Sequence, residues 1–143
     1  MLILGIVLMT VLGGYAQKGE IFTSEGKAIK GYDPVAFFTQ SMPVKGDENF
    51  QYNWKKSTWL FSSKENLEKF KADPEKYTPQ YGGYCAYGTS EGHKAPTQAD
   101  TWTILDNKLY FNYNRKVKEL WIPNQLALIH KADSLWPVIR DNN

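Results

Sequence analysis

Cysteine is nearly absent from this sequence, whose 143 residues include a single one, Cys85. A lone cysteine cannot form a disulfide within the chain, so no disulfide framework can stabilise the fold. In an oxidising compartment, an unpaired cysteine is either a small buried side chain or a group with a reactive or intermolecular role. The choice between these two alternatives decides how the function of this chain is interpreted.

A strong net charge is also lacking. The chain has 17 Lys and Arg against 15 Asp and Glu, a formal charge of +2, and its lysines are interleaved with acidic residues. Without a basic cluster, nucleic acid is excluded as an expected partner. Aromatic residues, by contrast, make up 15% of the chain. They predict a core of Tyr, Trp and Phe, in which buried phenol and indole groups need hydrogen-bond partners.

Only one long apolar run occurs, from Leu2 to Leu12. A helix needs about 20 apolar residues to cross a bilayer, and this run is roughly half as long. Its length suits a signal peptide, and Gly14-x-Ala16 has the small-x-small pattern of a cleavage site. We therefore expect a signal peptide over residues 1–16 and a periplasmic or secreted domain over residues 17–143, with no stable membrane span after cleavage. An uncleaved anchor is the alternative.

The remaining sequence predicts an α+β fold, a single compact domain with two antiparallel β-hairpins, short helices between them and a C-terminal helix. Apolar and polar residues alternate over 50–54, and an apolar segment returns over 58–61, which indicates the first hairpin. The turn-favouring pair Asp106-Asn107 separates the apolar segments 101–105 and 108–113 and indicates the second.

Capping residues and prolines predict where the helices begin and end. Asp33 before Pro34 is typical of a helix start, and Ser62-x-x-Glu65 has the form of a capping box for a helix that reaches about residue 71. Further predicted helices are a short turn at 74–77, a helix over 115–121 capped by Asn114, and a C-terminal helix from Asn124 to about Trp136 that Pro137 ends.

Several segments together resemble a known family. They are Tyr32-Asp33-Pro34-Val35, Trp59-Leu60-Phe61-Ser62-Ser63, residues 67–77, Gln80-Tyr81-Gly82-Gly83-Tyr84-Cys85-Ala86-Tyr87 and residues 131–137. The chain is similar over roughly residues 27–137 to the YHS-domain family, and in particular to a branch of small exported proteins. Some members of that branch are selenoproteins, and the resemblance aligns selenocysteine with Cys85. This implies redox or soft-metal chemistry at that position.

The chain departs from the metal-binding members of the family at three positions. The resemblance implies cysteines where this sequence has Ala36, Ser62 and Asn66. None of the three residues present is a thiolate, so the soft, sulfur-rich copper or zinc site of those relatives cannot be assembled here.

Cys85 is the candidate catalytic and metal-binding residue. As a functional group it would be a thiolate activated by a positive neighbour or a helix N-terminus, and His93 in the following loop is the candidate base or second metal ligand. The tyrosines near Cys85 are candidates for a pocket that binds a flat cofactor or ligand: Tyr81, Tyr84 and Tyr87. The alternatives are a buried cysteine, an exposed histidine and an aromatic core.

Two functions follow from these candidates. The first is an exported accessory protein that carries out thiol-dependent redox chemistry or holds a soft metal, copper or zinc, with a protein partner that exchanges electrons or metal. Because the chain has no resolving cysteine, any enzyme activity would be that of a thiol oxidoreductase acting with a partner. This hypothesis expects a thiol pKa below the free value of about 8.5. The second is a non-catalytic module with an aromatic-lined pocket for a small molecule or partner protein.

Overall fold

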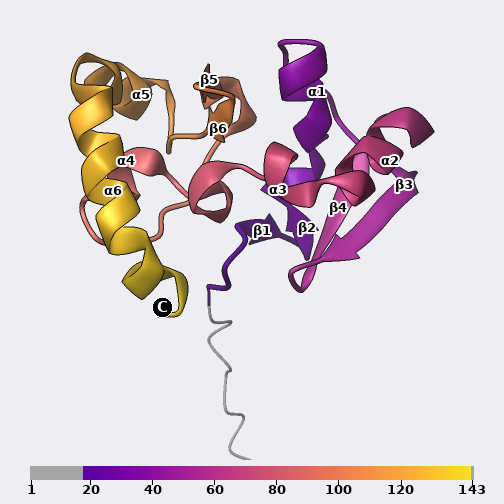
Figure 1. Ribbon diagram of the computed structural model, residues 1–143, viewed down its shortest axis with the longest axis horizontal. Helices are drawn as coiled ribbons and strands as arrows, with labels where there is room; N and C mark the ends of the chain where they lie inside the picture. Colours follow the sequence, from indigo (N-terminus) through magenta and orange to yellow (C-terminus); the bar gives the residue numbers. More distant parts are fainter. Residues whose placement is uncertain (1–17, 143) are drawn as a thin grey trace, which may run out of the picture.

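A computed structural model describes residues 18–142 of the chain (Figure 1). The signal peptide expected over residues 1–16, with its cleavage site, lies outside the described residues. Within residues 18–142, no helix has both the length and the apolar character needed to span a bilayer.

The larger sheet has four strands in the order β1-β2-β4-β3: β1 (Thr23–Ser24), β2 (Lys27–Ala28), β4 (Ser57–Phe61) and β3 (Asp47–Trp54). The predicted hairpin of β3 and β4 is confirmed, and it turns through Lys55 and Lys56, whose positive φ angles of 49° and 58° suit a tight two-residue turn. The sequence did not predict the short β1–β2 hairpin, nor the parallel pairing of β2 with β4.

The second predicted hairpin is also confirmed. It consists of β5 (Thr103–Leu105) and β6 (Lys108–Tyr110), paired antiparallel as a separate two-stranded sheet. Asp106 and Asn107 form its turn with φ angles of 51° and 59°. Short polar side chains tolerate this left-handed backbone better than most residues, which explains why the pair signals a turn.

Within residues 18–142, six α-helices connect and follow the strands. They are α1 (Pro34–Thr39), α2 (Lys64–Ala72), α3 (Pro74–Tyr77), α4 (Ala86–Ser90), α5 (Arg115–Trp121) and α6 (Gln125–Arg140), with 3₁₀ turns η1 (Ile29–Gly31), η2 (Gln80–Gly83), η3 (Ala99–Thr101) and η4 (Ile122–Asn124). The prediction that Pro137 ends the last helix is wrong, because α6 continues through it to Arg140. Proline fixes φ near the helical value, so Pro137 can keep the helical backbone although it has no N–H to donate.

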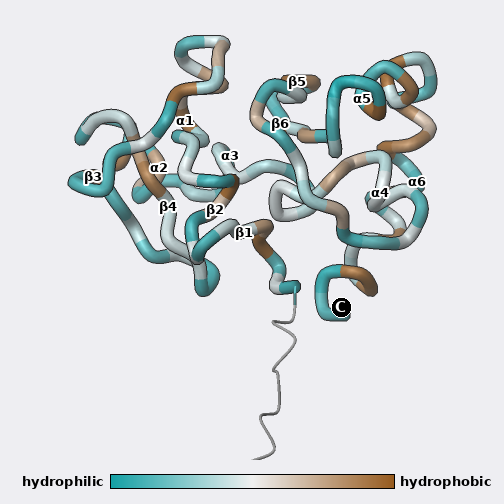
Figure 2. The backbone as a smooth tube through the Cα atoms, turned by 180° about the vertical axis from the view of Figure 1, so that it is seen from behind, coloured by the Kyte–Doolittle hydropathy of each residue, from teal (hydrophilic) through white to brown (hydrophobic). Residues whose placement is uncertain are grey.

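The buried apolar side chains of residues 18–142 form two cores. Figure 1 shows α1, α2, β3 and β4 in one half of the molecule and α4, α5 and α6 in the other. In the first, between the four-stranded sheet and α1 and α2, the fully buried Phe70 ring lies 5.1 Å from the rings of Trp59 and Phe61. The second core lies against α6 and contains Tyr81 and Trp121. The tube in Figure 2 accordingly shows hydrophobic stretches in both halves.

A buried carboxylate, Asp33, joins three elements of the first half. Its Oδ1 accepts hydrogen bonds from the backbone N–H groups of Val35 at 2.8 Å and Ala36 at 3.3 Å, so it caps α1 as predicted. Its Oδ2 accepts from the Ser62 N–H and Oγ at 2.8 and 2.7 Å and from Asn66 Nδ2 at 2.8 Å. Five donors thus compensate for removing the carboxylate from water.

Ser62 is therefore not the cap of α2 that the sequence predicted. Ser63 takes that position, and its Oγ accepts a hydrogen bond from the Asn66 N–H at 3.1 Å. The prediction was wrong by one residue because the Ser62 hydroxyl donates a hydrogen bond to Asp33, which is distant in the sequence.

A buried lysine joins the two ends of the described chain. Lys94 Nζ donates to the carbonyls of Lys18 at 3.0 Å, Arg140 at 3.0 Å and Asn142 at 2.9 Å. Lys18 Nζ donates in return to the Lys94 carbonyl at 3.0 Å. Burial lowers the pKa of Lys94, and the three carbonyls satisfy its three donors while bonding the end of α6.

Replacing Asp33 with Asn should strongly destabilise the fold. Whichever way the amide turns, its NH₂ group faces buried donors, so Asp33→Asn should lower the free energy of unfolding by about 3 kcal/mol in urea denaturation. The matched control is Asp47→Asn, since Asp47 is exposed and accepts one backbone hydrogen bond, from Asn49. That control should change stability by less than about 0.5 kcal/mol. Equal effects of the two variants would contradict the role given to Asp33.

Candidate functional site

Cys85 lies at the start of α4, where the chain passes from the first core to the second. Its N–H donates to the Ala95 carbonyl at 3.0 Å, and the N–H of Ala86 donates to the Phe111 carbonyl at 2.9 Å. These bonds fix the backbone on both sides of the sulfur. The Cys85 side chain is 1% exposed and occupies the N-cap position of α4.

The sulfur of Cys85 is surrounded by hydrogen-bonding groups. It accepts from the N–H of Gly88 at 3.4 Å and of Tyr113 at 3.2 Å, and its S–H donates to Asn112 Oδ1 at 3.5 Å. The same amide oxygen accepts from the Tyr87 N–H at 3.2 Å. This arrangement suits a neutral thiol, because the Asn112 oxygen needs a proton on the sulfur.

Burial raises the pKa of the Cys85 thiol, while the hydrogen bonds from the Gly88 and Tyr113 N–H groups oppose that rise. The thiolate hypothesis expected a thiol pKa below the free value. That expectation is wrong, because the pKa is raised. The cause is desolvation of the charged form, which outweighs the opposing effect of the backbone N–H groups of Gly88, Tyr113 and Tyr87. Cys85 is thus held mainly as the protonated thiol at neutral pH.

Cys85 is nevertheless among the residues that line an open pocket of about 270 Å³. This Cys85 pocket brings together three of the five site residues named from the sequence: Cys85, Tyr87 and His93. The others in its lining are Gly88, Glu91, Ala95, Tyr113 and Val117. His93 is exposed, and its Nε2 would lie 3.3 Å from a Cβ placed on Gly88, so the imidazole lies against the first turn of α4.

Tyr81 and Tyr84, the other two predicted ligand-binding residues, do not line this pocket. The Tyr84 hydroxyl donates to the Gly19 carbonyl at 2.9 Å, and burial raises its pKa to about 12. The Tyr81 hydroxyl donates to Asp133 Oδ1 on α6 at 2.9 Å. Both rings are buried and join segments far apart in the sequence, as the aromatic-core alternative expected.

Sequence reasoning did not name the other lining residues, among them Tyr113 and Val117, nor Asn112, which contacts the Cys85 sulfur. Asn112 is fully buried and its Nδ2 has no hydrogen-bond partner in the described structure. The predicted strand over 108–113 included Asn112 and Tyr113, but β6 ends at Tyr110. The polar run Asn112-Tyr113-Asn114 was the available signal that the strand stops before the pocket.

The metal site implied by the family resemblance does not fit these residues. Positions 36, 62 and 66 do meet in space, but around the Asp33 carboxylate, to which they present N–H and O–H donors. Within residues 18–142, no group of three or more His, Cys, Asp or Glu side chains could hold a metal ion. Cys85 and His93 alone supply two donors, fewer than a structural zinc site uses.

Residues 35–81 of the chain match the sequence model of the YHS domain. The matched segment contains most of α1, the β3–β4 hairpin, α2 and α3, and thus most of the first core; it ends four residues before Cys85. This match supports the resemblance to the YHS-domain family over residues 35–81. The chain matches none of the curated proteins or solved structures with which it was compared.

The protonation state of Cys85 can be measured directly, because the chain has no other cysteine. Since burial raises the thiol pKa, the rate of alkylation by iodoacetamide should rise with pH to a midpoint above the free-thiol value of about 8.5. At pH 7 the folded protein should react more slowly than the same protein in guanidinium chloride. A midpoint below 8.5 in the folded protein would show that the thiolate is stabilised instead.

Proposed function

We propose that this chain is a non-catalytic binding module that accepts a small ligand in the Cys85 pocket. The observation that carries the proposal is the position of the thiol: Cys85 is buried against the protein, yet its residue lines a pocket that opens to solvent. Tyr87 and Tyr113 offer aromatic walls, and Glu91 and His93 offer polar groups at the rim. A concave site with aromatic walls and few polar groups is typical of small-molecule binding.

The protonated state of Cys85 favours binding over nucleophilic chemistry. The thiolate is the nucleophile in disulfide exchange and oxidation, and burial disfavours it here. A neutral thiol is a small polarisable contact and a weak hydrogen-bond donor. We therefore assign Cys85 the role of a ligand contact, with Tyr87 as an aromatic wall.

Thiol-dependent redox exchange is the second candidate, and one observation favours it. Two backbone N–H groups, from Gly88 and Tyr113, point at the sulfur and would stabilise a thiolate after its proton leaves. His93 lines the same pocket and is the candidate group to take that proton. Because Cys85 has no resolving cysteine, the second sulfur would come from a partner protein.

We also propose that the protein acts after export, in the periplasm or outside the cell. The support is the apolar run of residues 2–12 followed by small residues at 14 and 16. The mass of the protein purified from the cell envelope or medium tests this, since cleavage after Ala16 should leave a chain that begins at Gln17.

A native mass spectrum of the purified full-length protein distinguishes the two candidates. A binding module should carry a molecule that is released on denaturation and is unaffected by dithiothreitol. Val117→Trp, which fills the pocket, should lose that molecule, whereas Val138→Trp, an exposed position on α6 outside the pocket, should retain it. We expect at least a tenfold loss of occupancy in the first variant.

The other outcomes of this measurement identify the alternatives. A covalent adduct or dimer that dithiothreitol removes, and that Cys85→Ala abolishes, would support redox exchange. If the mass rises by one copper or zinc ion when the metal is added, and does not rise in Cys85→Ala, then Cys85 binds a metal. That result would contradict our conclusion that these residues do not fit a metal site. Retention of the bound molecule in Val117→Trp would refute the Cys85 pocket as its site.

A further inference from the structure

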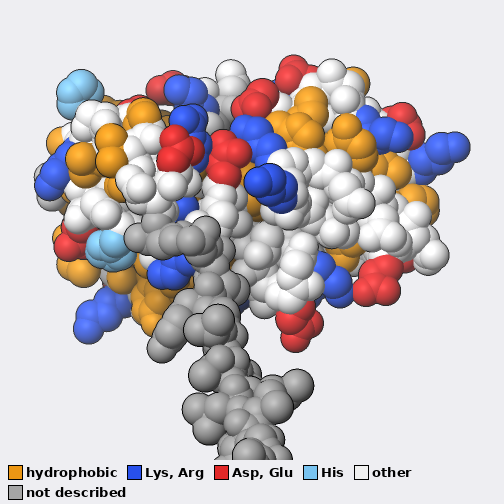
Figure 3. All heavy atoms as spheres, turned by 90° about the horizontal axis from the view of Figure 1, so that it is seen from below, with side chains coloured by type: hydrophobic (Ala, Val, Ile, Leu, Met, Phe, Trp, Pro, Cys, Tyr) orange, Lys and Arg blue, Asp and Glu red, His pale blue; other side chains and the backbone are white. Residues whose placement is uncertain are grey.

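A second concave site lies between the two cores, away from the Cys85 pocket. This groove has a volume of about 350 Å³ and is lined by residues from the β3–β4 turn, α3, η2, the start of β6 and α6. Charged side chains of both signs gather in the middle of the face shown in Figure 3. The groove contains three acidic residues, Glu20, Glu75 and Asp133, against two basic ones, Lys55 and Lys108.

The backbone at one wall of the groove is held in an uncommon conformation. Tyr81 and Gly82 have positive φ angles of 58° and 62°, and a Cβ on Gly82 would lie 1.8 Å from the Glu20 carbonyl oxygen. Only glycine permits this close approach. It places the Glu20 backbone against Gly82, and both residues line the groove.

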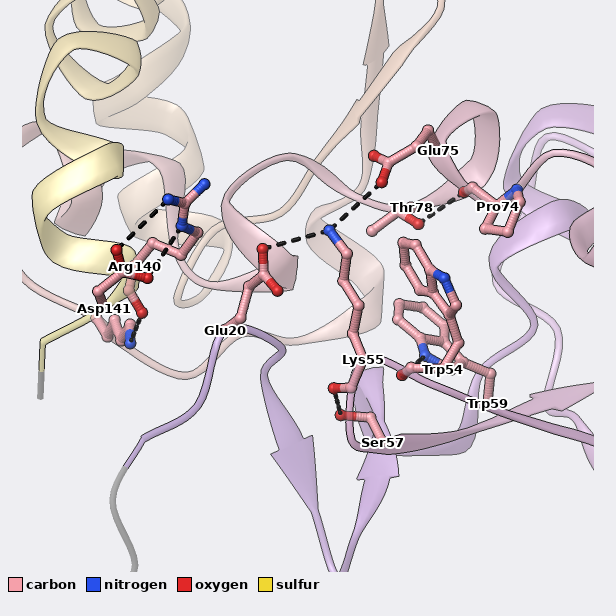
Figure 4. Close-up of polar contacts among 11 residues, drawn as sticks. Glu20, Trp54, Lys55, Ser57, Trp59, Pro74, Glu75, Thr78, Arg140 and Asp141 are labelled. Carbon is pink, nitrogen blue, oxygen red and sulfur yellow. Dashed lines mark hydrogen bonds and ion pairs between the residues drawn. The ribbon is translucent and has the colours of Figure 1, made fainter.

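On one side of the groove, the protein already binds an ammonium group of its own. Lys55 Nζ lies 3.3 Å from Glu20 Oε1 and 3.4 Å from Glu75 Oε1, and 4.7 Å from the centre of the Trp54 ring (Figure 4). Two carboxylates and an indole face therefore hold this cation.

On the α6 side, a carboxylate, a phenol and an indole also meet. The Lys94 ammonium lies 5.9 Å from the centre of the Trp136 ring, but no cation pairs with the carboxylate among the described residues. Asp133 Oδ1 accepts from the Tyr81 hydroxyl. Burial and the bond to Asp133 raise the pKa of Tyr81 far above its ordinary value, so the phenol remains a donor. Trp136, one turn after Asp133, packs edge-on against Tyr81 at 6.0 Å and also lines the groove.

We propose that this groove binds a primary ammonium group on an apolar stem, with the ammonium on Asp133 and the stem along Trp136 and Tyr81. Lys108 is the internal competitor, since its ammonium lines the same groove without an ion pair in the described structure. The site is distinct from the Cys85 pocket and shares no lining residue with it.

The test is a nuclear magnetic resonance titration of the full-length protein with n-butylammonium, with n-butanol as the uncharged probe. Butylammonium should cause saturable shifts at the Trp136 indole N–H and the Tyr81 and Asp133 amides, and butanol should not. Asp133→Asn should weaken binding about fivefold, the effect of one partly exposed ion pair. Glu119→Gln, an exposed change on α5 outside the groove, should leave the affinity unchanged.

Two further variants keep the result interpretable. Lys108→Gln should tighten butylammonium binding because it removes the competing charge. Cys85→Ala should leave butylammonium binding unchanged. A failure of the groove proposal can therefore be told apart from a failure of the Cys85 pocket as a binding site. Equal shifts with butanol and butylammonium, or unchanged affinity in Asp133→Asn, would overturn the proposal.

Discussion

The fold of the first half depends on one buried charge, the carboxylate of Asp33. It accepts hydrogen bonds from the start of α1, from the residue that follows β4 and from α2, so a single side chain fixes how a helix, a sheet edge and a second helix meet. Burying an anion costs free energy unless its oxygen atoms accept hydrogen bonds, and here five donors supply those bonds. The aromatic packing around Phe70 requires these elements in place, because its ring contacts β4 while its backbone belongs to α2.

The same network explains why the family resemblance does not carry a metal site with it. The positions at which the resemblance implies cysteines are brought together in space, but they face a carboxylate that is already satisfied. A metal ion requires electron-pair donors directed at one point, whereas Ala36, Ser62 and Asn66 direct hydrogen atoms at Asp33. The segment that matches the YHS domain, residues 35–81, is thus joined to Asp33 by hydrogen bonds.

The candidate site could be predicted in part. Sequence reasoning named Cys85, Tyr87 and His93, and these do line one pocket, because they are close in sequence and α4 turns the chain back on itself. It left two alternatives for Cys85, and only the activated thiolate expected a lowered pKa, whereas burial raises it. The sequence did not decide between them because the surroundings of Cys85 include Phe111 and Asn112, which lie more than 25 residues further along the chain. It also grouped Tyr81 and Tyr84 with Cys85, although their rings pack toward α6 and their hydroxyls bond to distant segments.

The sequence alone determined the features whose cause lies within a few residues. Asp33 and Asn114 cap the helices that follow them, and Asp106-Asn107 forms the turn of the second hairpin. Only the tertiary structure decided the parallel pairing of β2 with β4, the division into two cores and the groove between them. Hydrogen-bond caps and turns act between neighbours and leave a pattern in the sequence, whereas pairing and burial depend on which distant segments displace water from one another.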